Sequence, residues 1–138
     1  MCLAYDLTKP RADKIKAEAR KRGYIRVYKV CDRKYTGWMV NKWWKDGLQK
    51  AGNIKTKNGG WYAYLSLYQA RRFRDCFNSG LSSNYSIKVC YAKPSWIKRL
   101  GGDWDNNRVG IFTHLCFPDW DKGDMTIREF RAMSKGKP

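Results

Sequence analysis

The side chains best suited to nucleophilic or acid–base catalysis are few in this sequence, and their spacing does not group them. His114 is the only histidine, so a nuclease that needs two histidines is excluded. Cys90 and His114 could pair as nucleophile and base, because a thiol needs a neighbouring base to attack well, but nothing in their spacing brings them together. We therefore expect His114 to be a hydrogen-bonded residue of the core and predict no catalytic group.

Metal-binding patterns are also missing from the sequence. The five cysteines include no Cys-x-x-Cys pair, the spacing in which zinc sites usually present their ligands. Five of the twelve acidic residues lie between residues 103 and 124, but they do not form the Asp-x-Asp-x-Asp-Gly pattern of a calcium loop. No glycine-rich phosphate loop occurs either. The sequence predicts reduced core thiols, acidic residues that serve turns and caps, no metal and no cofactor.

The excess of basic over acidic residues is the most unusual feature of the composition. The chain of 138 residues has 29 Lys and Arg against 12 Asp and Glu, a formal charge of +17, which is more than solubility requires. Residues 1–57 carry +11 of this charge and residues 58–138 carry +6, so one basic face is expected. Phosphate polymers suit such a face, because each neutralised phosphate releases a condensed counterion. The predicted partner is RNA, DNA or a ribonucleoprotein.

Aromatic residues lie among these cations and strengthen the same prediction. Seven Trp and nine Tyr are present, and exposed rings can stack unpaired bases at ~1–3 kcal/mol each. The cations predicted to contact nucleic acid are Lys14, Lys21, Arg22, Arg26, Lys42, Lys45, Arg71, Arg72 and Arg74. The predicted aromatic contacts are Trp38, Trp43, Trp44, Trp61 and Tyr62. Trp38, Trp43 and Trp44 could instead form an exposed patch that binds a protein, since Trp is common at binding hot spots.

The elements that must position these side chains follow from local patterns. Residues 8–23 predict one helix, with an early Pro and a terminal Gly. Capping boxes, Ser66 with Gln69 and Thr126 with Glu129, predict helices over residues 67–78 and 126–133. A short helix is expected over residues 40–50 and a single turn over 94–100. The predicted strands span residues 24–31, which we expect to be partly exposed, 61–65, 86–91 and 109–117, which we expect to be central.

Together these elements predict a single small α+β domain over residues 1–138. We expect a mainly antiparallel sheet of about four strands flanked by two or three helices, with loose ends at residues 1–7 and 134–138. No run approaches the ~20 apolar residues of a membrane span, and the first residues lack the features of a signal peptide. The prediction is a cytoplasmic protein that binds no membrane. The sequence does not indicate an oligomeric state.

The order of these elements over residues 24–117 resembles small uncharacterised phage-encoded proteins. The runs that carry the resemblance are Arg-Val-Tyr-Lys-Val, Trp-Tyr-Ala-Tyr-Leu-Ser, Ile-Lys-Val-Cys-Tyr and Gly-Ile-Phe-Thr-His-Leu. A basic, Trp-rich chain of this length also resembles counter-defence inhibitors of the anti-CRISPR kind. The resemblance implies a protein of the host cytosol that occupies a nucleic-acid channel or a host protein surface and needs no catalytic residues.

The same order is similar to ADP-ribosyltransferase folds of the arginine–serine–glutamate class. That resemblance implies catalytic roles for Arg26, Ser66 and Glu129 on NAD, with Tyr62 or Tyr64 against the nicotinamide. The sequence departs from the family pattern, because Ser66 is not in a Ser-Thr-Ser run and Glu129 lacks the second glutamate of a Glu-x-Glu pair. The enzyme is therefore the alternative to a binding protein.

Overall fold

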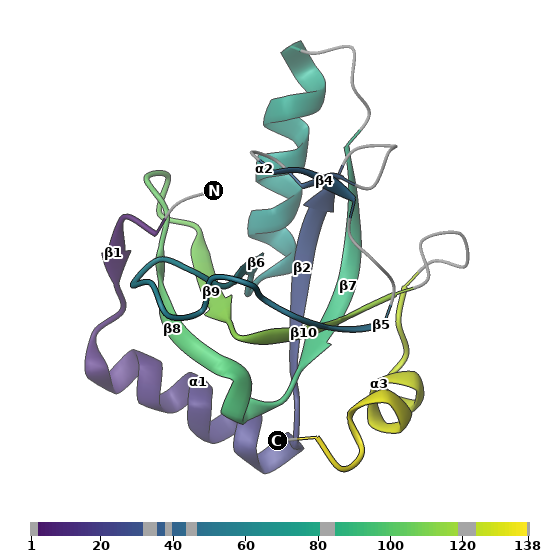
Figure 1. Ribbon diagram of the computed structural model, residues 1–138. Helices are drawn as coiled ribbons and strands as arrows, with labels where there is room; N and C mark the ends of the chain where they lie inside the picture. Colours follow the sequence, from purple (N-terminus) through teal and green to yellow (C-terminus); the bar gives the residue numbers. More distant parts are fainter. Residues whose placement is uncertain are drawn as a thin grey trace.

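The computed structural model of the chain describes residues 3–31, 36–37, 40–43, 47–80, 85–118 and 124–137. Within these ranges the chain forms three α-helices, a 3-10 turn and ten strands, which confirms the α+β class (Figure 1). The helices are α1 (Lys9–Arg22), α2 (Leu67–Gly80) and α3 (Ile127–Ser134), and the 3-10 turn is η1 (Pro94–Trp96). The strands are β1 (Tyr5–Asp6), β2 (Ile25–Cys31), β3 (Thr36–Gly37), β4 (Val40–Trp43), β5 (Gly47–Lys50), β6 (Trp61–Tyr64), β7 (Ser86–Ala92), β8 (Ile97–Gly102), β9 (Arg108–Phe112) and β10 (His114–Phe117).

The strands form one antiparallel sheet with the order β1-β8-β9-β6-β2-β7-β10-β5, and β3 and β4 add a branch at β2. Eight strands therefore lie along this path of the described chain, and the prediction of about four was wrong. The helix predicted over residues 40–50 is instead β4 and β5, and most of the turn predicted over residues 94–100 is β8. Pairing decides these segments, since β5 bonds along β10 and β8 along β9.

The apolar run at residues 109–117 is two strands rather than one. Thr113 separates β9, which pairs with β6 and β8, from β10, which pairs with β5 and β7. Strands β6, β2 and β7 lie between β9 and β10 in the hydrogen-bonded order, so the sheet must curl until both meet at Thr113. The backbone at this bend is satisfied: Thr113 N donates to Trp96 O at 2.9 Å, and Thr113 O accepts from Ala51 N at 2.9 Å.

Strand β2 lies at the centre of the sheet, between β6 and β7, although the sequence did not favour a central position. The strand is partly exposed as expected, because Arg26 is exposed and Tyr28 is half-buried. Its side chains alternate between two apolar clusters, as a strand requires. Ile25 and Val27 belong to the first cluster, while Tyr28 and Val30 contact the second. The two faces of this one strand therefore contribute to different apolar clusters.

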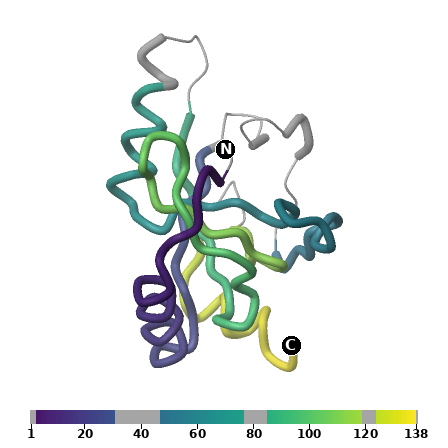
Figure 2. The backbone as a smooth tube through the Cα atoms, turned by 90° about the vertical axis from the view of Figure 1, so that its left-hand side faces the viewer, coloured from purple at the N-terminus to yellow at the C-terminus, as the bar shows by residue number. Residues whose placement is uncertain are grey.

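The helices pack on these clusters through a few residues each. Ala19 of α1 and Phe130 of α3 are buried in the first cluster, and Ala70 of α2 is buried in the second, where Phe73 packs against it. Seen from the side, α1 and α2 lie one below the other on the same side of the strands (Figure 2). The C-terminal end of α1 and the N-terminal end of α2 thus flank the same part of the sheet.

Local signals set the helix ends as the sequence predicts, with one exception. Gly23 ends α1 with a φ of +85° and donates its N–H to Ala19 O at 2.8 Å. The capping box of Thr126 and Glu129 is present at α3. At α2 only half of the predicted box forms: Gln69 N donates to Ser66 Oγ at 3.5 Å, but Gln69 Oε1 accepts from Arg108 N at 2.6 Å. This bond ties the start of α2 to β9.

Of the two chain ends that the sequence predicts to be loose, the segment of residues 1–7 takes part in the sheet. Tyr5 and Asp6 form β1 and pair with Gly102 and Gly101 of β8.

Among the helices that the structure describes, none combines the length and the apolar content that crossing a membrane would need.

Candidate functional site

A cavity of about 390 Å³ lies between the last turn of α1, the start of β2 and the junction of β6 with α2. Its polar lining consists of three arginines, one glutamate, two tyrosines and one serine. The arginines are Arg22, Arg26 and Arg108. Three arginines in the lining of one cavity are its unusual feature, because like charges repel one another unless an anion separates them.

Segments far apart in the sequence bring these side chains together. Arg22 ends α1, and Tyr24 precedes β2, so the α1–β2 connection delivers both to the cavity. Alternation along β2 places Arg26 and Tyr28 on the same side as Tyr24. Arg108 begins β9, where Arg108 O accepts a hydrogen bond from Leu65 N at 3.0 Å, next to Ser66. The lining thus depends on pairing between residues about forty positions apart.

Arg26 is held in position from inside the sheet. Its Nε donates to Tyr91 Oη at 3.1 Å, and its guanidinium carbon lies 5.5 Å from the centre of the Tyr91 ring. Burial tends to lower the pKa of Arg26, but interactions with Tyr91 and Tyr28 outweigh burial and raise the pKa above its ordinary value. Arg26 therefore stays charged, and the bond from Nε orients the plane of the group while further N–H donors remain on its terminal nitrogens.

The lining has an excess of positive charge. Glu18 is its one carboxylate, and Glu18 Oε2 lies 3.5 Å from Arg22 Nη2. Arg26 and Arg108 form no ion pair with any residue in the described ranges. The N-terminal end of α2, where Ser66 caps the helix, adds a partial positive charge of backbone N–H groups. The cavity is therefore suited to an anion.

Of the nine predicted nucleic-acid contacts, the structure brings Arg22 and Arg26 to this cavity. Lys14 and Lys21 on α1 and Arg71 and Arg72 on α2 are exposed. Arg74 lies 3.0 Å from Asp75 in an ion pair. Lys45 lies outside the described residues, and the side chain of Lys42 is likewise not described, although its backbone belongs to β4.

Two of the predicted aromatic contacts, Trp61 and Tyr62, have side chains that the structure describes, and both make contacts within the protein. Trp61 donates from Nε1 to Gln49 O at 3.0 Å and packs edge-on against Phe117, with ring centres 5.1 Å apart. Tyr62 Oη donates to Asn58 O at 2.6 Å. Stacking by these rings stays a prediction. Trp38 and Trp44 lie outside the described residues, as does the side chain of Trp43.

Two exposed rings were missed by the sequence reasoning. The side chain of Tyr68, in the first turn of α2, is 69% exposed, and that of Trp104 is 83% exposed. Trp104 lies in a turn organised by buried Asp103, whose Oδ1 accepts from Asp105 N and Asn107 N, both at 2.9 Å. The turn-forming residues around Trp104 were the available signal, since a loop tip exposes its side chains.

The alternative catalytic set is only partly assembled. Arg26 and Ser66 both line the cavity, but Glu129 lies on α3 and is not part of the lining. Glu129 Oε2 accepts from Thr126 N at 3.1 Å, in the capping box that the sequence predicts. The carboxylate at the cavity is Glu18, which sequence reasoning did not single out.

A second basic cluster lies on β8 and contains Lys98 and Arg99. The register of β8 against β9 steps from Ile97 to Arg99, so Lys98 is an extra residue in a β-bulge. Lys98 Nζ donates to Gly59 O at 2.7 Å and also to Thr56 O. This bulge directs two consecutive cations to the loop of residues 51–60.

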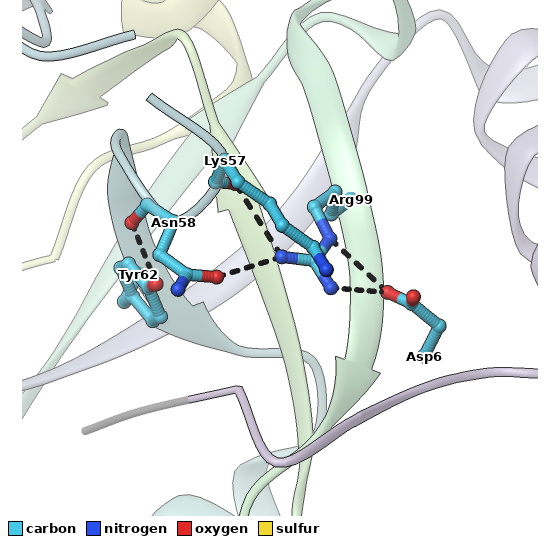
Figure 3. A network of polar contacts seen from close by, with 5 residues as sticks. All are labelled: Asp6, Lys57, Asn58, Tyr62 and Arg99. Atoms are coloured by element: carbon cyan, nitrogen blue, oxygen red, sulfur yellow. Dashed lines mark hydrogen bonds and ion pairs between the residues drawn. The ribbon is translucent and has the colours of Figure 1, made fainter. Parts of the chain in front are cut away.

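Arg99 makes the larger set of contacts in this second cluster (Figure 3). Its Nη2 lies 2.8 Å and its Nε 3.1 Å from Asp6 Oδ1 of β1. Its Nη1 donates to Asn58 Oδ1 at 2.8 Å and to Lys57 O at 3.4 Å. All three guanidinium nitrogens are therefore engaged by the protein itself.

The chain matches no protein-family model, no curated protein and no solved structure. The resemblance to phage-encoded proteins therefore stays a prediction. The cavity and its arginines are the features from which a function can be argued.

Proposed function

We propose that this protein binds nucleic acid without catalysing a reaction on it, and that the cavity arginines hold phosphate. The observation that carries the proposal is the convergence of Arg22, Arg26 and Arg108 on one cavity whose single carboxylate is Glu18. Guanidinium groups bind phosphate oxygens in pairs, which makes arginine the preferred residue for this ligand.

Exposed cations on the two helices that flank the cavity extend the proposed contact. Lys14 and Lys21 on α1 and Arg71 and Arg72 on α2 belong to the two helices that flank the site. Contacts of this kind position a backbone but carry little sequence preference. We therefore expect binding to depend weakly on base sequence and strongly on salt.

The test is fluorescence anisotropy with labelled single-stranded RNA, single-stranded DNA and duplex DNA of the same sequence. About four phosphate contacts on a single strand predict an affinity loss of roughly 50-fold between about 50 and 200 mM salt. Binding that is absent at low salt, or that does not change with salt, would overturn the proposal. A pull-down partner that survives nuclease would then favour the protein-binding alternative.

Matched charge variants locate the contact. Arg108→Gln removes a cavity cation and is expected to weaken binding about tenfold. Arg128→Gln removes the same charge from exposed α3, which does not line the cavity, and is expected to change affinity less than about twofold. Equal losses in the two variants would show that binding depends on net charge and not on this site.

A further inference from the structure

We infer that the cavity receives the terminal phosphate of a nucleic-acid strand, a phosphomonoester, in preference to an internal phosphodiester. This inference rests on the proposed function and names the ligand group of the same site. It is argued from the charge of the lining, the number of donors it offers and the size of the cavity.

The charge of the lining matches a dianion. With three guanidinium groups and one carboxylate, the lining has an excess of two positive charges. Glu18 is paired with Arg22, so the excess belongs chiefly to Arg26 and Arg108, which form no ion pair in the described part of the chain. An internal phosphodiester carries one negative charge, whereas a phosphomonoester carries about 1.5 to 2 at neutral pH. The monoester therefore compensates the lining more completely.

The donors around the cavity also exceed what a phosphodiester can use. Arg26 has five N–H donors and keeps some of them after its interactions with Tyr91 and Tyr28, and Arg108 has no side-chain bond to a described residue. The hydroxyl of Ser66 accepts from Gln69 N and can still donate. A monoester presents three unbridged oxygens to these groups and a diester only two.

The size of the cavity suits the end of a strand. Its volume of about 390 Å³ exceeds that of a phosphate group and falls within the range of pockets that hold a small ligand. Tyr24 and Tyr28 supply aromatic wall, and the Tyr24 ring is fixed edge-on to Tyr91 at 5.6 Å between centres. One nucleotide attached to the bound phosphate can contact these rings, while the exposed cations of α1 and α2 meet the diesters that follow.

The test compares three single-stranded oligonucleotides of one sequence, labelled internally, that differ only at their ends. One carries a 5′-phosphate, one a 3′-phosphate, and one has hydroxyl groups at both ends. We expect one phosphorylated end to raise affinity about tenfold over the hydroxyl ends. Arg108→Gln should abolish that preference, because it lowers the affinity of the phosphorylated strand about tenfold more than that of the hydroxyl-ended strand, whereas Arg128→Gln should retain the preference.

The possible failures are distinguishable. If all three strands bind equally and the arginine variants weaken them alike, the inference is overturned and the proposed function remains. If no strand binds, both fail. A free nucleoside monophosphate that competes as well as the phosphorylated strand would overturn the assignment to a strand end. Thermal unfolding of each variant, with Arg26→Gln as the second cavity variant, confirms that a lost preference is not lost folding.

Discussion

Two basic clusters of this protein differ in what their cations already hold. In the β8 cluster, Arg99 bonds to Asp6, Asn58 and the Lys57 carbonyl, and Lys98 bonds to two carbonyls of the 51–60 loop. At the cavity, Arg26 bonds to Tyr91 through Nε and also interacts with Tyr28, and Arg108 has no ion pair in the described chain. Both clusters are basic in sequence, but the cavity arginines retain more donors for a ligand than Arg99 does. Unfilled donors, and not charge alone, are therefore what distinguish the proposed binding site from the β8 cluster.

The largest expected effect is a loss of oligonucleotide affinity when two cavity arginines are substituted. The double variant Arg26→Gln, Arg108→Gln should lose about 100-fold in oligonucleotide affinity, because two charge-assisted contacts are removed from one ligand group. The free energy of unfolding should change by less than about 1 kcal/mol, since Arg26 and Arg108 are exposed residues. Anisotropy and urea denaturation measure the two quantities. A loss of stability with unchanged affinity would reverse the roles assigned to the clusters.

The next largest effect is a loss of stability when Arg99 of β8 is substituted. Arg99→Ala should lower the free energy of unfolding by about 2 kcal/mol, because a side chain that is only 19% exposed loses several charge-assisted hydrogen bonds. Asp6 is largely exposed, so its ion pair accounts for a minor part. Oligonucleotide affinity should stay within about twofold. Arg99→Lys keeps the charge without the planar group and should recover less than half of the stability. An affinity loss in Arg99→Lys would contradict the assignment.

A smaller effect is expected from two buried titratable groups of the core, Cys116 and Tyr64. Burial raises the pKa of the Cys116 thiol to about 12, although Lys93 partly opposes this. Burial, with the nearby charge of Asp103, also raises the pKa of Tyr64. The unfolded chain releases these protons at lower pH than the folded chain, so stability is complete below about pH 8 and falls as pH rises. Cys116 alone predicts a loss of about 1 kcal/mol between about pH 9 and pH 10.

Denaturation midpoints measured from neutral to alkaline pH test this prediction. Tyr64→Phe removes one of the two groups and should make the decline above about pH 10 shallower, since tyrosine ionises near that pH when unfolded. A free energy of unfolding that does not change across this range would exclude buried neutral Cys116 and Tyr64. Because both groups lie in the core, the effect is separate from either basic cluster.

The smallest expected effect tests how far the proposed site extends along α1. Lys14→Gln, on the exposed surface of α1, should weaken binding about twofold and reduce the salt dependence by about 0.7 in log–log slope, as expected for one phosphate contact on a single strand. The end-phosphate preference should remain. A loss as large as that of the cavity variants would extend the site along α1.

Much of the local structure could be predicted because its causes are local. The end of α1 at Gly23 and the capping box of Thr126 and Glu129 depend on neighbours within a few residues, and both were predicted. Residues 40–50 were predicted to be helical, but hydrogen bonds to β10, such as those along Leu48 and Cys116, make their end a strand. Such partners lie far along the chain, so no local pattern reports them.

Some residues of the candidate site could likewise be predicted from the sequence, and others could not. Arg22 and Arg26 were predicted as contacts because a basic helix precedes a basic strand. Arg108 and Glu18 were not predicted, since Arg108 reaches the cavity through the pairing of its backbone with Leu65 and through Gln69. Sequence reasoning also had no means to separate Arg99, whose donors are occupied, from Arg26.

By itself the sequence determined that the chain carries a large positive charge, that β2 has two different faces, where α1 ends and where α3 begins. Only the tertiary structure decided that the sheet curls at Thr113, which cations share a cavity, and which cations form hydrogen bonds within the protein. The physical reason is range: caps and side-chain alternation depend on neighbours along the chain, whereas the availability of an arginine depends on acceptors that strand pairing brings from distant segments.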